Sequence, residues 1–227
     1  AHITLLFVLV PFVLRLPVGK QSYQAYLASI RFSRVRPFFQ LLLLALSCCL
    51  IQALCQAGGV LIYRASQGLP VNWISMRATF DFASLVPSDS WSWLNPLPSM
   101  FEEVMFRGVV LSLFLTRYSK PQAVLFSALG FGAMHLLNLA SGRETLWVLG
   151  QFVWSTIFGL FYGVLVLKTN SLWPAMLIHY LGNLFIEPIT GYLQHAASVE
   201  IQVLYGILFF FGIVPTILMI LWTFLYT

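Results

Sequence analysis

Two adjacent glutamates and an arginine lie in an otherwise apolar stretch of the chain. Glu102, Glu103 and Arg107 fall within residues 97–116, a run long enough to form a transmembrane helix. An ionisable side chain inside a bilayer is costly and indicates function by default. Glu103 and Arg107 are four residues apart, so we expect them to share a helix face and pair. Glu102 points about 100° away from Glu103 and therefore needs a partner of its own.

Further polar side chains lie in two other apolar stretches. His135 falls near the end of residues 121–140, and His179 and Asn183 share one helix face within residues 172–187. Counted from the predicted outer ends of their helices, Glu102 and these three residues lie at similar depths, roughly 6–12 Å into the bilayer. Three helices that bring polar groups to one level predict a single site.

Side chains of these types form a buried cluster of the kind that catalyses hydrolysis. Hydrolysis needs a base that activates water and donors that stabilise an oxyanion. A metal site is the alternative, because Glu102, His135 and His179 are the ligand types of several catalytic zinc sites. However, no two of them have the spacing of an HExxH helix, and Arg107 nearby would disfavour a cation. We therefore expect no metal, with zinc held by these three residues as the alternative.

The motifs resemble those of a known family. In order and approximate spacing, Glu102-Glu103-x-x-x-Arg107, Phe131-x-x-x-His135 and His179-x-x-x-Asn183 are similar to the three motifs of the CPBP family. These proteins are the CAAX-protease and bacteriocin-processing intramembrane endopeptidases, also called the Abi or Rce1-type family. The resemblance covers about residues 98–187, the expected catalytic core, and includes the flanking Phe106-Arg107-Gly108 and Ser171-Leu172-Trp173-Pro174-Ala175.

The resemblance implies a glutamate-dependent protease. Glu102 would act as the base and His135 would hold the same water, while His179 and Asn183 would supply oxyanion donors. Glu103 with Arg107 would orient the cluster or the substrate. Two other functions remain open: a catalytically silent relative that acts as a scaffold or subunit of a membrane complex, and a proton-coupled transporter. The transporter is disfavoured because the sequence shows no inverted repeat.

Composition predicts the elements that must position these residues. Hydrophobic residues make up 59% of the 227 residues and charged residues only 8%, so a soluble domain is excluded. The apolar stretches are long and continuous, which favours an all-α, polytopic helix bundle over a membrane barrel. We expect one transmembrane domain over residues 1–227 with about seven spans: 1–14, 38–63, 97–116, 121–140, 145–167, 172–187 and 201–226. The long connection 64–96 is expected to be a partly helical segment in the membrane interface.

Charge distribution predicts how the chain crosses the membrane. With the 15–37 loop inside, eight basic residues lie inside and three outside, which favours an outer N-terminus and an inner C-terminus. This topology puts the site in the outer half of the bilayer, whereas a CAAX substrate would approach from the cytosol. The basic residues follow membrane topology, so we expect no nucleic-acid partner. The expected partners are membrane lipids, a peptide or membrane-protein substrate, and partner subunits if the chain belongs to a complex.

A pair of glycines predicts close helix packing. Gly159-x-x-x-Gly163 is a small-residue pattern that lets helices approach one another. We expect the helix of residues 145–167 to pack inside the bundle. The sequence does not identify the substrate.

Overall fold

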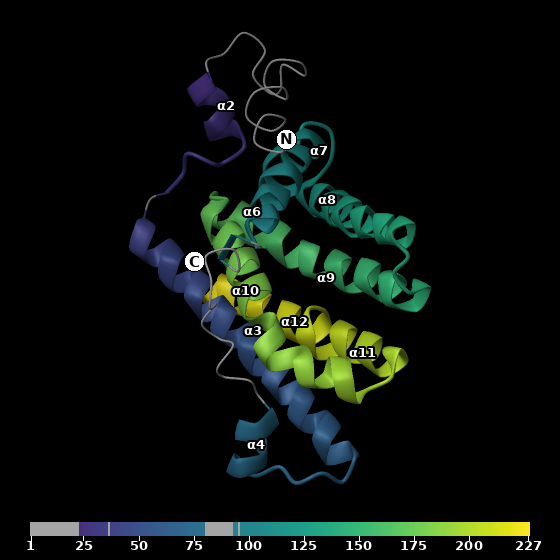
Figure 1. Ribbon diagram of the computed structural model, residues 1–227. Helices are drawn as coiled ribbons and strands as arrows, with labels where there is room; N and C mark the ends of the chain where they lie inside the picture. Colours follow the sequence, from purple (N-terminus) through teal and green to yellow (C-terminus); the bar gives the residue numbers. More distant parts are fainter. Residues whose placement is uncertain (1–22, 36, 80–92, 95) are drawn as a thin grey trace.

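The computed structural model describes residues 23–35, 37–79, 93–94 and 96–227, and within these residues the chain is helical without strands (Figure 1). The all-α prediction is therefore confirmed. The predicted first span, residues 1–14, lies outside the described residues, as does Trp91 of the long connection. The helices of the first half of the chain are α2 (Tyr23–Ser29), α3 (Phe38–Ser66), α4 (Trp73–Thr79) and α6 (Leu97–Glu103), and α6 continues as a π-helical stretch (Val104–Val110) into α7 (Leu111–Phe114).

The second half of the chain supplies most of the bundle. Its helices are α8 (Lys120–Met134), a 3₁₀ stretch (His135–Ser141), α9 (Thr145–Thr169), α10 (Trp173–Ala196), α11 (Val199–Tyr205), a π-helical stretch (Gly206–Phe210) and α12 (Ile213–Tyr226). In Figure 1, α8 lies along α9, and α10 crosses α3. The C-terminal α12 packs against both α3 and α9.

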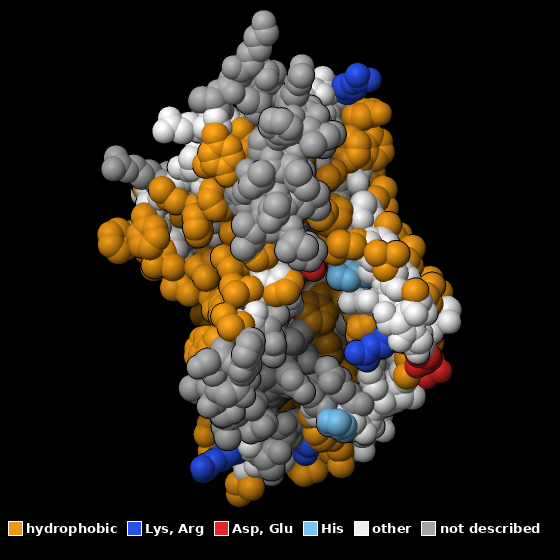
Figure 2. All heavy atoms as spheres, turned by 45° about the horizontal axis from the view of Figure 1, so that its top comes forward, with side chains coloured by type: hydrophobic (Ala, Val, Ile, Leu, Met, Phe, Trp, Pro, Cys, Tyr) orange, Lys and Arg blue, Asp and Glu red, His pale blue; other side chains and the backbone are white. Residues whose placement is uncertain are grey.

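Four helical segments among the described residues are long and apolar enough to cross a membrane. They are Phe38–Ser66, Lys120–Ser141, Thr145–Thr169 and Val199–Tyr226. The helix from Leu97 to Phe114 carries three charged side chains and is not among them, and neither is α10. Figure 2 shows hydrophobic side chains over much of the described surface with few charged ones between them, as expected of a surface that faces lipid.

Local sequence signals set several helix ends. Ser119 and Gln122 form a capping box at the start of α8, and Pro121 occupies its first turn. Asn170 ends α9 in the left-handed conformation, with φ of 52°. One predicted end is wrong: residues 172–187 were expected to form the sixth span, but α10 continues through Pro188 to Ala196. A proline inside a helix removes one backbone hydrogen bond, and here that loss does not end the helix.

The glycine pattern in α9 makes the close contact that the sequence predicts. A Cβ on Gly163 would lie 2.8 Å from a Val124 methyl group, and one on Gly159 would lie 3.1 Å from the Cα of Ala128. Both neighbours belong to α8, so the two helices touch along this seam. The seam also fixes the distance between α9 and the polar residues of the site.

Candidate active site

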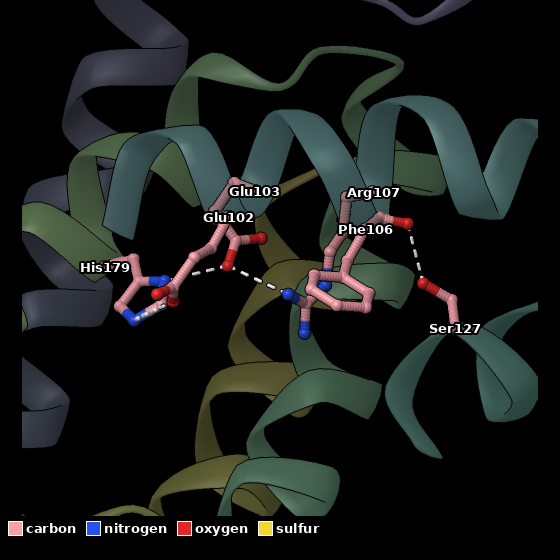
Figure 3. A network of polar contacts seen from close by, with 6 residues as sticks. All are labelled: Glu102, Glu103, Phe106, Arg107, Ser127 and His179. Atoms are coloured by element: carbon pink, nitrogen blue, oxygen red, sulfur yellow. Dashed lines mark hydrogen bonds and ion pairs between the residues drawn. The ribbon is translucent and has the colours of Figure 1, made fainter. Parts of the chain in front are cut away.

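Glu103 is the centre of a buried polar network (Figure 3). Its Oε1 accepts a hydrogen bond from Nη1 of Arg107 at 2.9 Å and lies 2.8 Å from Nδ1 of His179. The side chains of Glu103 and Arg107 are both fully buried. The ion pair that the four-residue spacing predicts is thus present. His179 was predicted to lie at the same site, but its contact with Glu103 from another helix was not predicted.

The helix that carries these residues changes its winding at the site. α6 ends at Glu103, and the next seven residues, Val104–Val110, are π-helical. Ser127 of α8 donates a hydrogen bond to the carbonyl oxygen of Phe106 within this stretch, at 2.7 Å. A π-helical turn is often found at functional sites, where it changes the direction of the side chains that follow. Here the stretch begins directly after Glu103 and contains Arg107.

Glu102 has a different environment from its neighbour. Its side chain is 27% exposed and lines a cavity of about 330 Å³, and its Oε2 lies 3.9 Å from Nε2 of His179. One imidazole therefore faces both glutamates, with Nδ1 toward Glu103 and Nε2 toward Glu102. A carboxylate paired with a guanidinium accepts hydrogen bonds, so Nδ1 donates and Nε2 is the nitrogen that faces the cavity.

The other two residues that the sequence predicts also reach this cavity. His135 begins the 3₁₀ stretch after α8, and its ring contacts Phe131 edge to face at 5.1 Å. Asn183 lies one turn after His179 on α10 and is exposed to the cavity. The structure thus brings Glu102, His135, His179 and Asn183 to one cavity, from three different helices.

Much of the cavity wall is aromatic. Beyond the polar residues it is lined by aromatic and amide side chains that no motif identified: Trp147, Gln151, Trp154, Phe158, Tyr162, Phe210 and Phe211 among them. Gln151 accepts a hydrogen bond from Asn138 at 2.8 Å. An apolar lining with a few convergent polar groups is typical of a pocket for an organic ligand.

Two aromatic rings enclose the buried cation of the site. The guanidinium carbon of Arg107 lies 4.2 Å from the centre of the Phe131 ring and 5.1 Å from that of the Tyr162 ring. Phe131 belongs to one of the sequence motifs, but Tyr162 does not. Rings above a desolvated cation add to its stabilisation because their faces carry negative charge density.

A metal ion at this site would need several ligand side chains close together. Within the described part of the chain, no three His, Cys, Asp or Glu side chains are grouped so that they could hold one. Of the alternative zinc ligands, His179 already has one ring nitrogen directed at Glu103. The metal-free site stays a prediction that a chelation experiment must test.

Comparisons with known proteins identify the segment that holds the site. Residues 90–185 match the family model described as type II CAAX prenyl endopeptidase Rce1-like. Neither the curated proteins nor the solved structures gave a significant match. The matched segment holds all six site residues predicted from the sequence, and the resemblance stated on those residues is confirmed.

Proposed function

Since residues 90–185 match the family model described as type II CAAX prenyl endopeptidase Rce1-like, we propose that the protein is an intramembrane endopeptidase in which Glu102 activates water. The observation that carries the proposal is the difference in burial and surroundings between two adjacent glutamates. Glu103 is buried between Arg107 and His179, whereas Glu102 faces the cavity beside Nε2 of the same imidazole. The first carboxylate is buried in an ion pair, and the second is partly exposed at the cavity, where a water molecule can approach it.

The proposed reaction uses the residues as follows. The Glu102 carboxylate takes a proton from a water molecule while the resulting hydroxide forms a bond to the carbonyl carbon of the substrate. The carbonyl oxygen becomes an oxyanion, which the side-chain amide of Asn183 stabilises by a hydrogen bond. His135 holds the attacking water. The carbon–nitrogen bond then breaks, and the proton on Glu102 passes to the leaving amine.

His179 links the two carboxylates in this scheme. Because Nδ1 donates to Glu103, only Nε2 can serve the reaction. When the imidazole is protonated, Nε2 also becomes a donor that can join Asn183 at the oxyanion. The arrangement resembles that of other hydrolytic sites in which a buried carboxylate orients a histidine.

The matched family and the cavity wall support one substrate class. A CAAX protein carries a prenylated cysteine near its C-terminus, followed by aliphatic residues. The aromatic lining of the cavity suits a substrate of this apolar character, and its amide groups suit a peptide backbone. We propose prenylated C-terminal peptides as the first substrates to test.

Cleavage of such a peptide in ¹⁸O-labelled water tests the proposal. Purified protein in lipid vesicles should release the C-terminal fragment and leave one ¹⁸O atom in the new carboxyl group. Activity should persist with metal chelators. Loss of activity on chelation, restored by zinc, would favour the metal site instead. Proton-coupled uptake without cleavage would support a transporter, and neither activity would support a silent scaffold.

A further inference from the structure

A tyrosine outside the sequence motifs contacts two of the residues that build the site. Tyr162 lies on α9, a helix that carries none of the six residues predicted from the sequence, and its side chain is fully buried. Its ring stacks on the imidazole of His179, with centroids 5.4 Å apart and planes 25° apart. The same ring faces the guanidinium of Arg107. We propose that Tyr162 is a positioning residue that holds the His179 ring between the two glutamates; its catalytic consequence rests on the proposed function.

The orientation of His179 needs such a constraint. The torsion that turns an imidazole about its Cβ–Cγ bond has broad minima, so the hydrogen bond of Nδ1 with Glu103 alone defines it loosely. A half turn would place carbon atoms where Nδ1 now meets Glu103 and Nε2 now faces Glu102. The stacked ring of Tyr162 on one side and the edge-on ring of Phe131, with centroids 5.8 Å apart, restrict this rotation.

The ring of Tyr162 makes these contacts, and its hydroxyl does not. In the described part of the chain, the hydroxyl oxygen is buried and has no hydrogen-bond partner. The contact with His179 is made by the ring, through stacking. Removing only the hydroxyl should therefore preserve the position of His179, whereas removing the ring should not.

Helix α9 also leaves space for the Arg107 guanidinium, which is the other partner of Glu103. Gly159 lies three residues before Tyr162, and a Cβ there would come within 2.9 Å of Nη2 of Arg107. The guanidinium thus lies against the bare backbone of α9 with the Tyr162 ring beside it. Helix α9 supplies no reacting group, but it contacts both Arg107 and His179, the two partners of Glu103.

Three variants separate the ring from the hydroxyl and from general packing. Tyr162→Leu removes the ring, and Tyr162→Phe removes only the hydroxyl. Phe161→Leu is the matched control, because Phe161 is also fully buried on α9, where its ring contacts those of Phe158 and Tyr162. We expect Tyr162→Leu to lower kcat on the prenylated peptide by about 10- to 100-fold, the scale of a small misplacement of a catalytic group. KM should change little, and Tyr162→Phe and Phe161→Leu should stay near the wild-type kcat.

A spectroscopic readout keeps the test independent of peptide cleavage. The ¹⁵N chemical shifts of histidine-labelled protein in nanodiscs report which ring nitrogen of His179 carries the proton, with assignment by His179→Gln. Wild type and Tyr162→Phe should show a protonated Nδ1, and Tyr162→Leu should lose this preference. If Tyr162→Leu does not purify as a folded protein, Tyr162→Met replaces it.

Each outcome decides the proposal. Wild-type shifts and kcat in the ring-less variant would overturn it, as would an equal loss in Phe161→Leu or in Tyr162→Phe. If the wild type cleaves no peptide, the proposed function fails, and the chemical shifts of His179 still decide the role of Tyr162.

Discussion

At the residue scale, the two neighbouring glutamates of the site have different environments. Glu103 and Arg107 have fully buried side chains, and Glu102 is partly exposed. The sequence predicted the Glu103–Arg107 pair because both residues lie on one helix, where spacing determines contact. The contact of His179 with Glu103 and the ring of Tyr162 could not be predicted, because they depend on how separate helices face one another.

Replacement of Glu103 should destabilise the protein more than replacement of Glu102. Glu103→Gln leaves the Arg107 guanidinium buried without a charge partner, which should cost about 3–5 kcal/mol in the free energy of unfolding. Glu102→Gln changes a partly exposed side chain and should cost much less. Thermal unfolding in detergent measures both. Adding Arg107→Met to Glu103→Gln should recover part of the loss, and equal stability of the two single variants would contradict the assignment.

Asn183 should contribute to the transition state rather than to the fold. Loss of one oxyanion donor typically lowers kcat by about 10²–10³-fold, and we expect Asn183→Ala to show a loss of that size with wild-type thermal stability. Asn72→Ala is the control, since Asn72 lies in the exposed connection before α4. An unchanged kcat in Asn183→Ala would remove Asn183 from the oxyanion site.

At the scale of elements, the helices were predictable and their local winding was not. Apolar length located α3, α8, α9 and the final helix within a few residues. The π-helical stretch after Glu103 had no signal in the sequence, because it depends on contacts such as that of Ser127 with the Phe106 carbonyl. The extension of α10 was missed because Glu187 and Pro188 are typical of a helix end.

The seam between α8 and α9 should tolerate no added side chain at Gly159. Gly159→Ala places a methyl group 2.9 Å from Nη2 of Arg107 and 3.1 Å from Ala128, and overpacking of this kind costs about 1–3 kcal/mol. Gly58→Ala is the control, because a Cβ there has no neighbour within 4 Å, and it should be neutral or stabilising by about 0.5–1 kcal/mol. Thermal unfolding compares them, and equal effects would contradict the tight seam.

At the scale of the whole molecule, the fold gathers basic residues at one end of the bundle. The ammonium group of Lys168, at the end of α9, lies over the ring of Phe224 of α12. The carbonyl oxygen of Arg31 accepts a hydrogen bond from the backbone N–H of Leu172. Arg117 and Lys120 lie near the start of α8, which meets the end of α9 along the glycine seam. The basic residues that were predicted to lie inside, as far as the structure describes them, thus lie at the same end of the bundle. Which side of the membrane this end faces stays a prediction.

Cysteine labelling tests the predicted topology. A membrane-impermeant thiol reagent added to intact cells should modify a cysteine at Ser141, in the turn between α8 and α9, and should spare one at Ser33, near the basic end. Both serines are exposed. The experiment requires a background without Cys48, Cys49 and Cys55. The reverse pattern would overturn the topology and give the cavity a cytosolic approach, as a CAAX substrate requires.

The most direct test of the central claim is the rate at which Glu102→Gln protein cleaves a prenylated peptide. Glutamine keeps the shape of the side chain but cannot accept the proton, and a general base contributes about 10²–10⁴-fold. We expect kcat to fall by about 10²-fold or more in folded protein. The control is Glu144→Gln, a change at an exposed glutamate in the turn before α9, which should leave kcat unchanged. Wild-type activity in the Glu102→Gln protein would contradict the proposal that Glu102 activates the water.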